Sequence, residues 1–247
     1  VKILKEFVDR LFIIFPFEIE YFKKHGIEPV YEGNPSPDAI ETKVKESPTF
    51  DEFTAKNDLS HKPIIALVAG SRKQEIKYNL PVMLKMVDRF PDYQFVIAGA
   101  PSLSESTYAP YIAGKNVKLI FGQTYPLLKS STLAFVTSGT ATLEAALINV
   151  PQVVCYKGNF FSMLIAWMVI KVKYISLVNL NMEIEVVREL KQYDLTPSSL
   201  YAEAIKLVPG TEERKVMLDN YAKLRQMLGE TGTSKRVGAK MVEFITK

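Results

Sequence analysis

The sequence is poor in the residues that build cross-links and metal sites. It contains one cysteine and two histidines among 247 residues, so no disulfide can form within the chain, and no Cys/His spacing typical of zinc is present. Cys155 lies in an apolar run and is interpreted as a small core residue rather than a nucleophile. His25 and His61 lie in a helix end and a linker, belong to no Ser/Asp or Cys constellation, and are interpreted as surface residues. We therefore expect no metal site.

Two common nucleotide-binding fingerprints are also missing. No Gly-x-Gly-x-x-Gly follows a predicted strand, and Gly-x-x-x-x-Gly-Lys-Ser/Thr occurs nowhere. NAD-dependent and P-loop chemistry are therefore disfavoured, and we expect no cofactor.

Long apolar runs are absent. The longest, residues 160–170, has 11 residues, whereas a helix needs about 20 to cross a bilayer. A buried helix is the favoured interpretation. The alternative is a helix that contacts a membrane through Trp167, between Lys157, Lys171 and Lys173.

The sequence also lacks a strong excess of either charge. The 31 basic and 27 acidic residues leave a net charge of +4, which does not imply a nucleic-acid partner. The single cysteine fits a cytoplasmic location. The chain opens on Val1 without a signal segment. The absent initiator Met indicates a sequence that begins inside a longer protein.

Short β-rich runs alternate with helix-length segments from residue 63 onward. The runs cover residues 64–68, 94–98, 117–121, 133–137 and 152–156. This spacing predicts a parallel sheet with helices on both faces. A helical tail follows, with apolar residues at helical intervals over 198–208, 211–228 and 234–245.

The first 62 residues are organised differently. Residues 11–15 and 27–31 are strand-like, with a helix to about Lys24 between them. The stretch 36–62 is rich in charge, Pro, Ser and Thr and has no clear period, which predicts a linker or exposed connection and a domain boundary near 40–60.

The loop after the run at 64–68 is a first candidate site, because ligands of doubly wound sheets collect beyond the carboxyl ends of the strands. Gly70 lets the backbone approach a ligand, Ser71 can cap the next helix or bond a phosphate oxygen, and Arg72 offers a bidentate fork for phosphate. A plain turn with a capped helix and a solvated Arg72 is the alternative.

The loop after the run at 133–137 is the second candidate site. Ser138 and Thr140, with their backbone N–H groups, form an anion-friendly turn at the start of a helix predicted over 141–148. Glu144 can accept hydrogen bonds from two adjacent sugar hydroxyls. Dipole stabilisation alone would also select a carboxylate there, and both interpretations stay open from the residues.

Taken together, these motifs resemble lipid-A-disaccharide synthase along nearly the whole chain. Their order and spacing are more specific than any piece alone. The matching residues are Pro16-Phe17-Glu18, Gly33-Asn34-Pro35 with Asp38, Gly70-Ser71-Arg72 with Glu75-Ile76, Ser138-Gly139-Thr140-Ala141 with Glu144, Tyr174-Ile175-Ser176-Leu177 with Asn179-Leu180, and Glu185-Val186-Val187 with Glu189-Leu190 and Gln192.

The resemblance implies a two-domain, Rossmann-like GT-B glycosyltransferase of lipid A biosynthesis. Such an enzyme joins UDP-2,3-diacylglucosamine to 2,3-diacylglucosamine 1-phosphate and releases UDP, in the cytoplasm or at the cytoplasmic face of the inner membrane. The implied parts are the end of an N-terminal acceptor domain (1–40), a linker (41–62), the nucleotide-sugar-binding domain (63–195) and C-terminal helices (196–247).

The resemblance also implies roles for particular residues. Ser71 and Arg72, with Glu75 beside them, are expected at the nucleotide or its diphosphate, and Glu144 at the ribose hydroxyls. Ser138, Gly139 and Thr140 are expected at phosphate, and Asn179, Glu189 and Gln192 are expected to complete the donor site. The general base is expected in the N-terminal part of the family fold, upstream of residue 1, so this chain alone is predicted to be inactive.

The sequence departs from the family pattern at two places. The family usually has Ala-Gly-Arg or Ala-Gly-Lys where this chain has Met182-Glu183-Ile184, and Asn34 stands where many relatives carry His. Another UDP-sugar GT-B enzyme and a non-catalytic nucleotide-sugar-binding module are the competing hypotheses. Periodicity does not distinguish a helical tail packed on its own domain from one exchanged within a homodimer.

Overall fold

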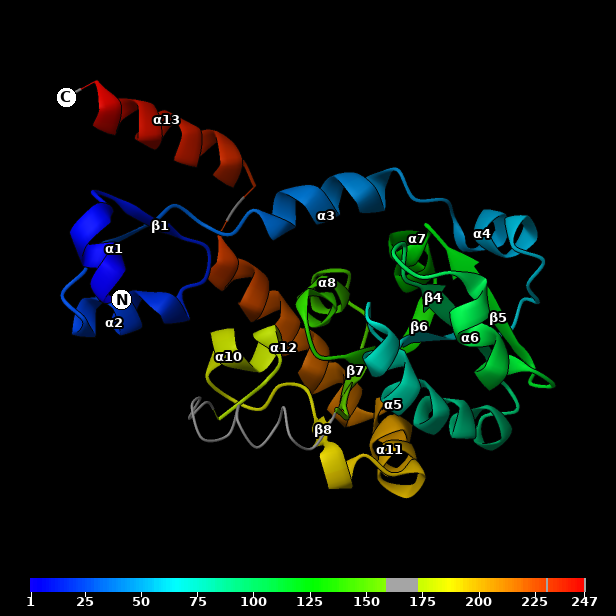
Figure 1. Ribbon diagram of the computed structural model, residues 1–247. Helices are drawn as coiled ribbons and strands as arrows, with labels where there is room; N and C mark the ends of the chain where they lie inside the picture. The colour runs from blue at the N-terminus through cyan, green and yellow to red at the C-terminus, as the bar shows by residue number, and fades with distance from the viewer. Residues whose placement is uncertain (159–172, 230, 247) are drawn as a thin grey trace.

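A six-stranded parallel sheet forms the centre of the computed structural model, which describes residues 1–158, 173–229 and 231–246 (Figure 1). Its strand order is β5-β4-β3-β6-β7-β8. The strands are β3 (Ile64–Val68), β4 (Gln94–Gly99), β5 (Val117–Phe121), β6 (Ser131–Thr137), β7 (Gln152–Tyr156) and β8 (Glu189–Lys191). The apolar segment 160–170, with its two alternative interpretations, lies outside the described residues.

The apolar runs of the sequence account for five of these strands. The predicted bounds of β3, β5 and β7 are confirmed, and β4 and β6 extend slightly beyond theirs. Strand β8 was not predicted, because a three-residue strand of sequence Glu-Leu-Lys shows no apolar period.

Alternate residues of the central strands enter two separate hydrophobic clusters, as expected for a sheet covered on both faces. Ile65 and Leu67 of β3 pack into the larger cluster, with residues of the helices at Lys73–Met83 (α5), Pro197–Ala204 (α11) and Glu212–Leu228 (α12). Ile64 and Ala66 pack into the smaller one, with residues of the helices at Phe50–Lys56 (α4) and Thr124–Lys129 (α7). The predicted doubly covered sheet is therefore confirmed.

Helices connect the strands and form both ends of the chain. The α-helices are α1 (Lys2–Phe7), α2 (Phe17–Lys24), α3 (Ser36–Lys45), α4 (Phe50–Lys56), α5 (Lys73–Met83), α6 (Glu105–Ile112), α7 (Thr124–Lys129), α8 (Thr140–Leu147), α10 (Leu177–Met182), α11 (Pro197–Ala204), α12 (Glu212–Leu228) and α13 (Thr233–Ile245). Short 3₁₀ helices cover Leu84–Arg89, Gln192–Asp194 and Ile205–Leu207. No helix within the described ranges combines the length and apolarity needed to cross a bilayer.

The stretch 36–62 differs from the exposed connection expected for it, because it contains α3 and α4. Thr49 caps α4: its amide donates to Glu52 Oε2 at 2.8 Å, and the Glu52 amide donates to its hydroxyl at 3.4 Å. Phe53 of α4 is fully buried in the smaller cluster. The Thr-x-x-Glu spacing was the available signal for this helix.

The N-terminal residues form a separate layer beside the main sheet. Strands β1 (Leu11–Ile13) and β2 (Pro29–Tyr31) pair in parallel, and α13 returns to lie beside them (Figure 1). The ring of Phe244 on α13 meets that of Phe12 edge-on at 6.2 Å. The helical tail therefore contacts the N-terminal layer of its own chain.

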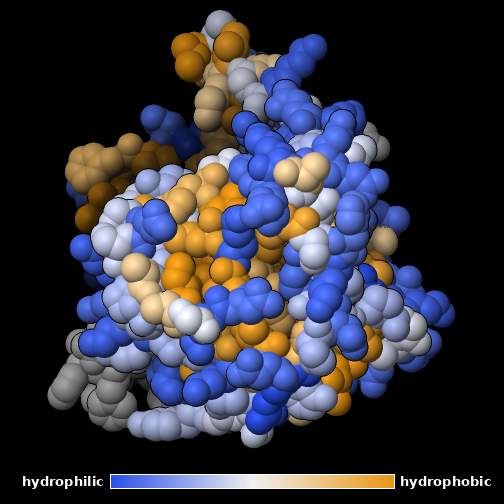
Figure 2. Space-filling model, turned by 90° about the vertical axis from the view of Figure 1, so that its right-hand side faces the viewer, coloured by the Kyte–Doolittle hydropathy of each residue, from blue (hydrophilic) through white to orange (hydrophobic). Residues whose placement is uncertain are grey.

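Strand β5 forms one edge of the main sheet, and β8 forms the other. The last residue of β5, Phe121, is 37% exposed. Figure 2 turns this side toward the viewer and shows apolar surface among hydrophilic side chains.

Candidate functional site

A cleft of about 280 Å³ lies at the carboxyl ends of β3, β4 and β6. This is the edge of a doubly wound sheet where ligands bind. Its lining residues are Val68, Gly70, Ser71, Arg72, Glu75, Ala98, Gly99, Ala100, Pro101, Thr124, Thr137, Ser138, Gly139, Thr140 and Ala141. The structure thus brings together both predicted loops.

Glu75 organises the first loop. Its Oε2 accepts hydrogen bonds from the amides of Ser71 (2.8 Å) and Arg72 (3.2 Å), which lie at the start of α5. Gly70 has φ +113°, and a Cβ there would lie 2.5 Å from the Cβ of Glu75. The loop needs glycine for both reasons. The two amides already hold a carboxylate, so an anionic ligand cannot use them without displacing it.

Arg72 is an exposed cation of the first loop. Its side chain is 81% exposed, and Nη1 lies 3.4 Å from Glu75 Oε1. An exposed ion pair of this kind contributes little to stability. The guanidinium can therefore leave Glu75 for a phosphate in the cleft at small cost.

The second loop brings the start of a helix to the cleft. Helix α8 begins at Thr140 with Gly139 as its N-cap, and the first amides of a helix have no acceptor within it. The hydroxyl of Thr142 donates to Gly139 O at 2.8 Å and holds the turn. Such amides, together with the helix dipole, favour an anion at this end of a helix.

The hydroxyl of Ser138 is already committed. It lies 2.7 Å from the backbone oxygen of Ile175, and because a carbonyl oxygen can only accept, Ser138 must donate its proton there. Toward the cleft it offers lone pairs. A phosphate at this loop is therefore bound by amides rather than by the Ser138 proton.

Glu144 lies one turn into α8 and is partly buried. Desolvation by burial raises the pKa of its carboxyl group, and a hydrogen bond with Tyr125 acts in the opposite direction. Tyr125 follows Thr124, which lines the cleft. Glu144 itself is not among the residues that line the cleft.

The prediction from sequence missed the wall that β4 contributes, residues 98–101. The amide of Ala100 donates to the buried hydroxyl of Tyr108 at 2.9 Å, and Ser102 Oγ donates to Ser71 O at 3.2 Å. The signal was present, because Gly99-Ala100-Pro101 directly follows a predicted strand and the strand-end rule applies to it as well.

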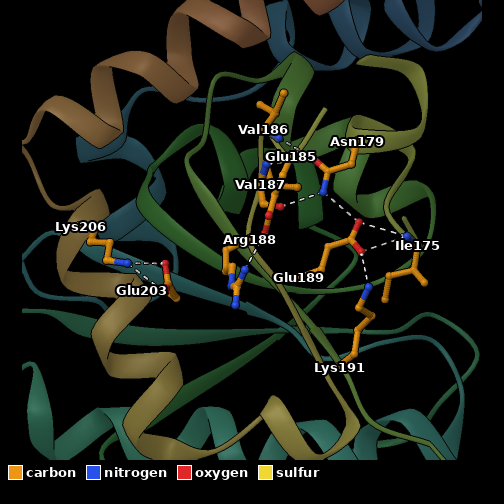
Figure 3. A network of polar contacts seen from close by, with 10 residues as sticks. All are labelled: Ile175, Asn179, Glu185, Val186, Val187, Arg188, Glu189, Lys191, Glu203 and Lys206. Carbon is orange, nitrogen blue, oxygen red and sulfur yellow. Dashed lines mark hydrogen bonds and ion pairs between the residues drawn. The ribbon is translucent and has the colours of Figure 1, made fainter. Parts of the chain in front are cut away.

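Asn179 and Glu189 belong to a buried polar network rather than to the lining of this cleft in the described part of the chain (Figure 3). Asn179 Oδ1 accepts from the amides of Val186 (2.8 Å) and Val187 (3.0 Å), and its Nδ2 donates to Val187 O at 2.8 Å. Nδ2 also donates to Glu189 Oε1 at 2.9 Å. Both side chains therefore stabilise the segment 175–189.

Gln192 directly follows β8 and has φ +51°. Its Nε2 is buried without a hydrogen-bond partner among the described residues. Left-handed backbone at a residue other than glycine is a sign of strain, and such strain clusters at functional sites. Gln192 does not line the cleft.

A model of the lipid-A-disaccharide synthetase family matches residues 1–241. The chain belongs to this family. Synthases from Anaeromyxobacter dehalogenans and Syntrophus aciditrophicus are each 33% identical to it, over 98% and 97% of this chain. One from Gloeothece citriformis is 34% identical over 98%. The chain spans 64% of the length of each of these curated relatives.

Solved structures share the fold at low identity. A putative UDP-N-acetylglucosamine 2-epimerase from Listeria monocytogenes has a TM-score of 0.62 at 18% identity, covering 96% of this chain and 60% of that one. The S. aureus MnaA–UDP co-structure has a TM-score of 0.63 at 15% identity, and the match covers 99% of this chain and 62% of that one. The calicheamicin glycosyltransferase CalG4 has a TM-score of 0.59 at 13% identity, and the match covers 98% of this chain and 56% of that one. These likenesses confirm the GT-B-type fold.

The departure from the synthase pattern at Met182-Glu183-Ile184 has a structural counterpart. Glu183 ends α10 with φ +56° and ψ +11°, the left-handed conformation. Glycine is the residue that adopts this conformation without strain. The backbone at Glu183 therefore has a conformation that favours glycine.

Another cleft, of about 560 Å³, lies between the residues that precede β8 and helices α11 and α12. Its lining includes two ion pairs (Figure 3). Arg188 Nη1 lies 3.0 Å from Glu185 Oε1, and Lys206 Nζ lies 2.9 Å from Glu203 Oε1. None of the site residues predicted from the sequence lines it.

Proposed function

We propose that this chain is the donor-binding part of a lipid-A-disaccharide synthase. The whole enzyme joins UDP-2,3-diacylglucosamine to 2,3-diacylglucosamine 1-phosphate, with release of UDP, and this chain binds the UDP portion of the donor. Membership of the synthase family supports the reaction. Because both substrates are acylated, we place the reaction at the cytoplasmic face of the inner membrane.

The observation that supports this proposal most directly is the meeting of Arg72 with the start of α8 in one cleft. When the glycosidic bond of the donor breaks, negative charge grows on the leaving diphosphate. Preorganised amides and a guanidinium stabilise such charge without reorganising at the moment of reaction. We assign the diphosphate to the amides of residues 139–141, with Arg72 swinging from Glu75 to join them.

Glu144 is assigned to the ribose. A carboxylate accepts hydrogen bonds from two adjacent hydroxyls, and Glu144 lies on the helix whose first turn holds the diphosphate in this proposal. Ser138, with lone pairs facing the cleft, is assigned as a further acceptor for a sugar hydroxyl or amide. Both assignments place the nucleoside near α7 and the β4 wall. Glu75 acts by holding the Gly70–Arg72 turn.

The test is calorimetric titration of UDP into this chain and its variants. We expect Arg72→Ala to weaken binding about 10- to 100-fold, the effect of losing a charge-assisted hydrogen bond, and Glu144→Ala to weaken it about tenfold. Arg89→Ala is the matched control, because Arg89 is exposed near the amino end of β4, away from the cleft. If the unsubstituted chain and all three variants bound UDP with equal affinity, the proposed placement of the nucleotide would be contradicted.

A further inference from the structure

Glu189 is a buried carboxylate that is held by four hydrogen-bonding groups. Its residue is 6% exposed. It accepts from the amide of Ile175 (3.0 Å to Oε2), the amide of Ser176 (2.9 Å to Oε1) and Asn179 Nδ2 (2.9 Å to Oε1), and Lys191 Nζ lies 3.3 Å from Oε2 (Figure 3). A buried ion is costly to desolvate, and apolar residues often fill such a position with equal or greater stability. A role in fixing local geometry therefore deserves a test.

One peptide group connects this carboxylate to the cleft. The peptide between Ile175 and Ser176 donates through its N–H to Glu189 Oε1 and accepts through its C=O from Ser138 Oγ at 2.7 Å. A peptide group is planar, with its N–H and C=O pointing in opposite directions. Fixing one end therefore fixes the other, and each bond polarises the next.

We propose that Glu189 is a positioning residue for the donor site, acting through the Ile175–Ser176 peptide on Ser138. This inference rests on the proposed function, because Ser138 lines the cleft assigned to UDP. Glu189 directs the Ser138 proton away from the cleft and sets the position of the loop that leads into α8. The edge strand β8 thus contributes to a site that it does not line.

The other bonds of the network keep the Glu189 carboxylate in place. Asn179 closes the segment 175–189 by accepting from the amides of Val186 and Val187 while donating to Glu189. Ser176 caps α10, accepting from the Asn179 amide at 3.2 Å. The carboxylate, its peptide partner and the cap are therefore held as one unit.

The experiment is a double-mutant cycle read by the dissociation constant of UDP for this chain. Glu189→Gln keeps the side-chain size but removes the charge and replaces one of the two acceptor oxygens with an NH₂ donor, so the amides of Ile175 and Ser176 no longer face an ionised carboxylate. We expect the dissociation constant to rise about tenfold, the loss of one hydrogen bond to a charged group. In a Ser138→Ala background, the same change is expected to have less than about a twofold effect.

Glu203→Gln is the matched control. Glu203 of α11 pairs with Lys206 of the following 3₁₀ helix, and Figure 3 shows no contact between this pair and Glu189. Substitution of Glu203 is expected to leave UDP affinity unchanged. Effects of Glu189→Gln and Ser138→Ala that simply add, or an unchanged affinity in a folded Glu189→Gln chain, would overturn the inference. Absence of UDP binding by the unsubstituted chain would overturn the donor site itself and this inference with it.

A second measurement avoids the risk that Glu189→Gln does not fold. Amide hydrogen exchange of the unsubstituted chain reports on the Ile175 and Ser176 amides, both held by Glu189. Because these amides are coupled to Ser138, UDP is expected to slow their exchange severalfold. Exchange at these two amides that is the same with and without UDP would overturn the coupling.

Discussion

Replacing Glu183 with glycine should stabilise the protein. Glu183 ends α10 in the left-handed conformation, with φ +56°, which costs a residue with a side chain about 1–2 kcal/mol. Glycine removes this cost but enlarges the conformational freedom of the unfolded chain, which offsets about 0.4–1 kcal/mol. We expect a net gain of about 0.5–1 kcal/mol in the free energy of unfolding.

The measurement is thermal unfolding of the two proteins in parallel. For a chain of this size, about 1 kcal/mol corresponds to about 2–4 °C in Tm, so Glu183→Gly should raise Tm by about 1–4 °C. Glu46→Gly is the matched control. Glu46 is also an exposed residue that ends a helix, but its φ is −77°, so glycine there should cost about 0.4–1 kcal/mol.

The opposite signs make the comparison decisive. If Glu183→Gly lowers the Tm by as much as Glu46→Gly does, the left-handed conformation of Glu183 stores no strain and the reasoning is wrong. If the signs differ as expected, Glu183 holds a left-handed conformation that glycine adopts at lower cost.

Three further predictions concern the cleft. Gly70→Ala should lower the free energy of unfolding by about 1–3 kcal/mol, measured by urea denaturation, because the new Cβ meets Glu75 at a positive φ. Burial raises the pKa of Glu144 above its ordinary value of 4.5. The stabilisation that comes from protonated Glu144 is therefore fully present below pH 4.5 and is lost as pH rises through the raised pKa. Glu144→Gln should therefore increase stability at pH 7 relative to the parent, while weakening UDP binding; unchanged stability would contradict the desolvation argument. Thr137→Val removes a buried hydroxyl that has no partner among the described residues and should stabilise the chain by about 1 kcal/mol, whereas Thr54→Val, which breaks a 3.0 Å bond to Asp51 O, should destabilise it.

The sequence by itself determined five strands of the main sheet and the two loops of the cleft. Five short apolar runs indicated strands, and their spacing left room for crossover helices. Because parallel strands end at one edge, Ser71, Arg72 and Ser138 could be expected together. The helical spacing of apolar residues likewise predicted a helical tail, and the structure confirms it in α11, α12 and α13.

Only the tertiary structure decided what the polar residues of the site do. Glu75 turned out to bind the amides of its own loop, and Ser138 to donate to Ile175, 37 residues away. Asn179 and Glu189 likewise find their partners within 175–191. Periodicity reports which face of an element is buried, but a hydrogen bond depends on the positions of two atoms, and those positions are set by how the strands and loops pack.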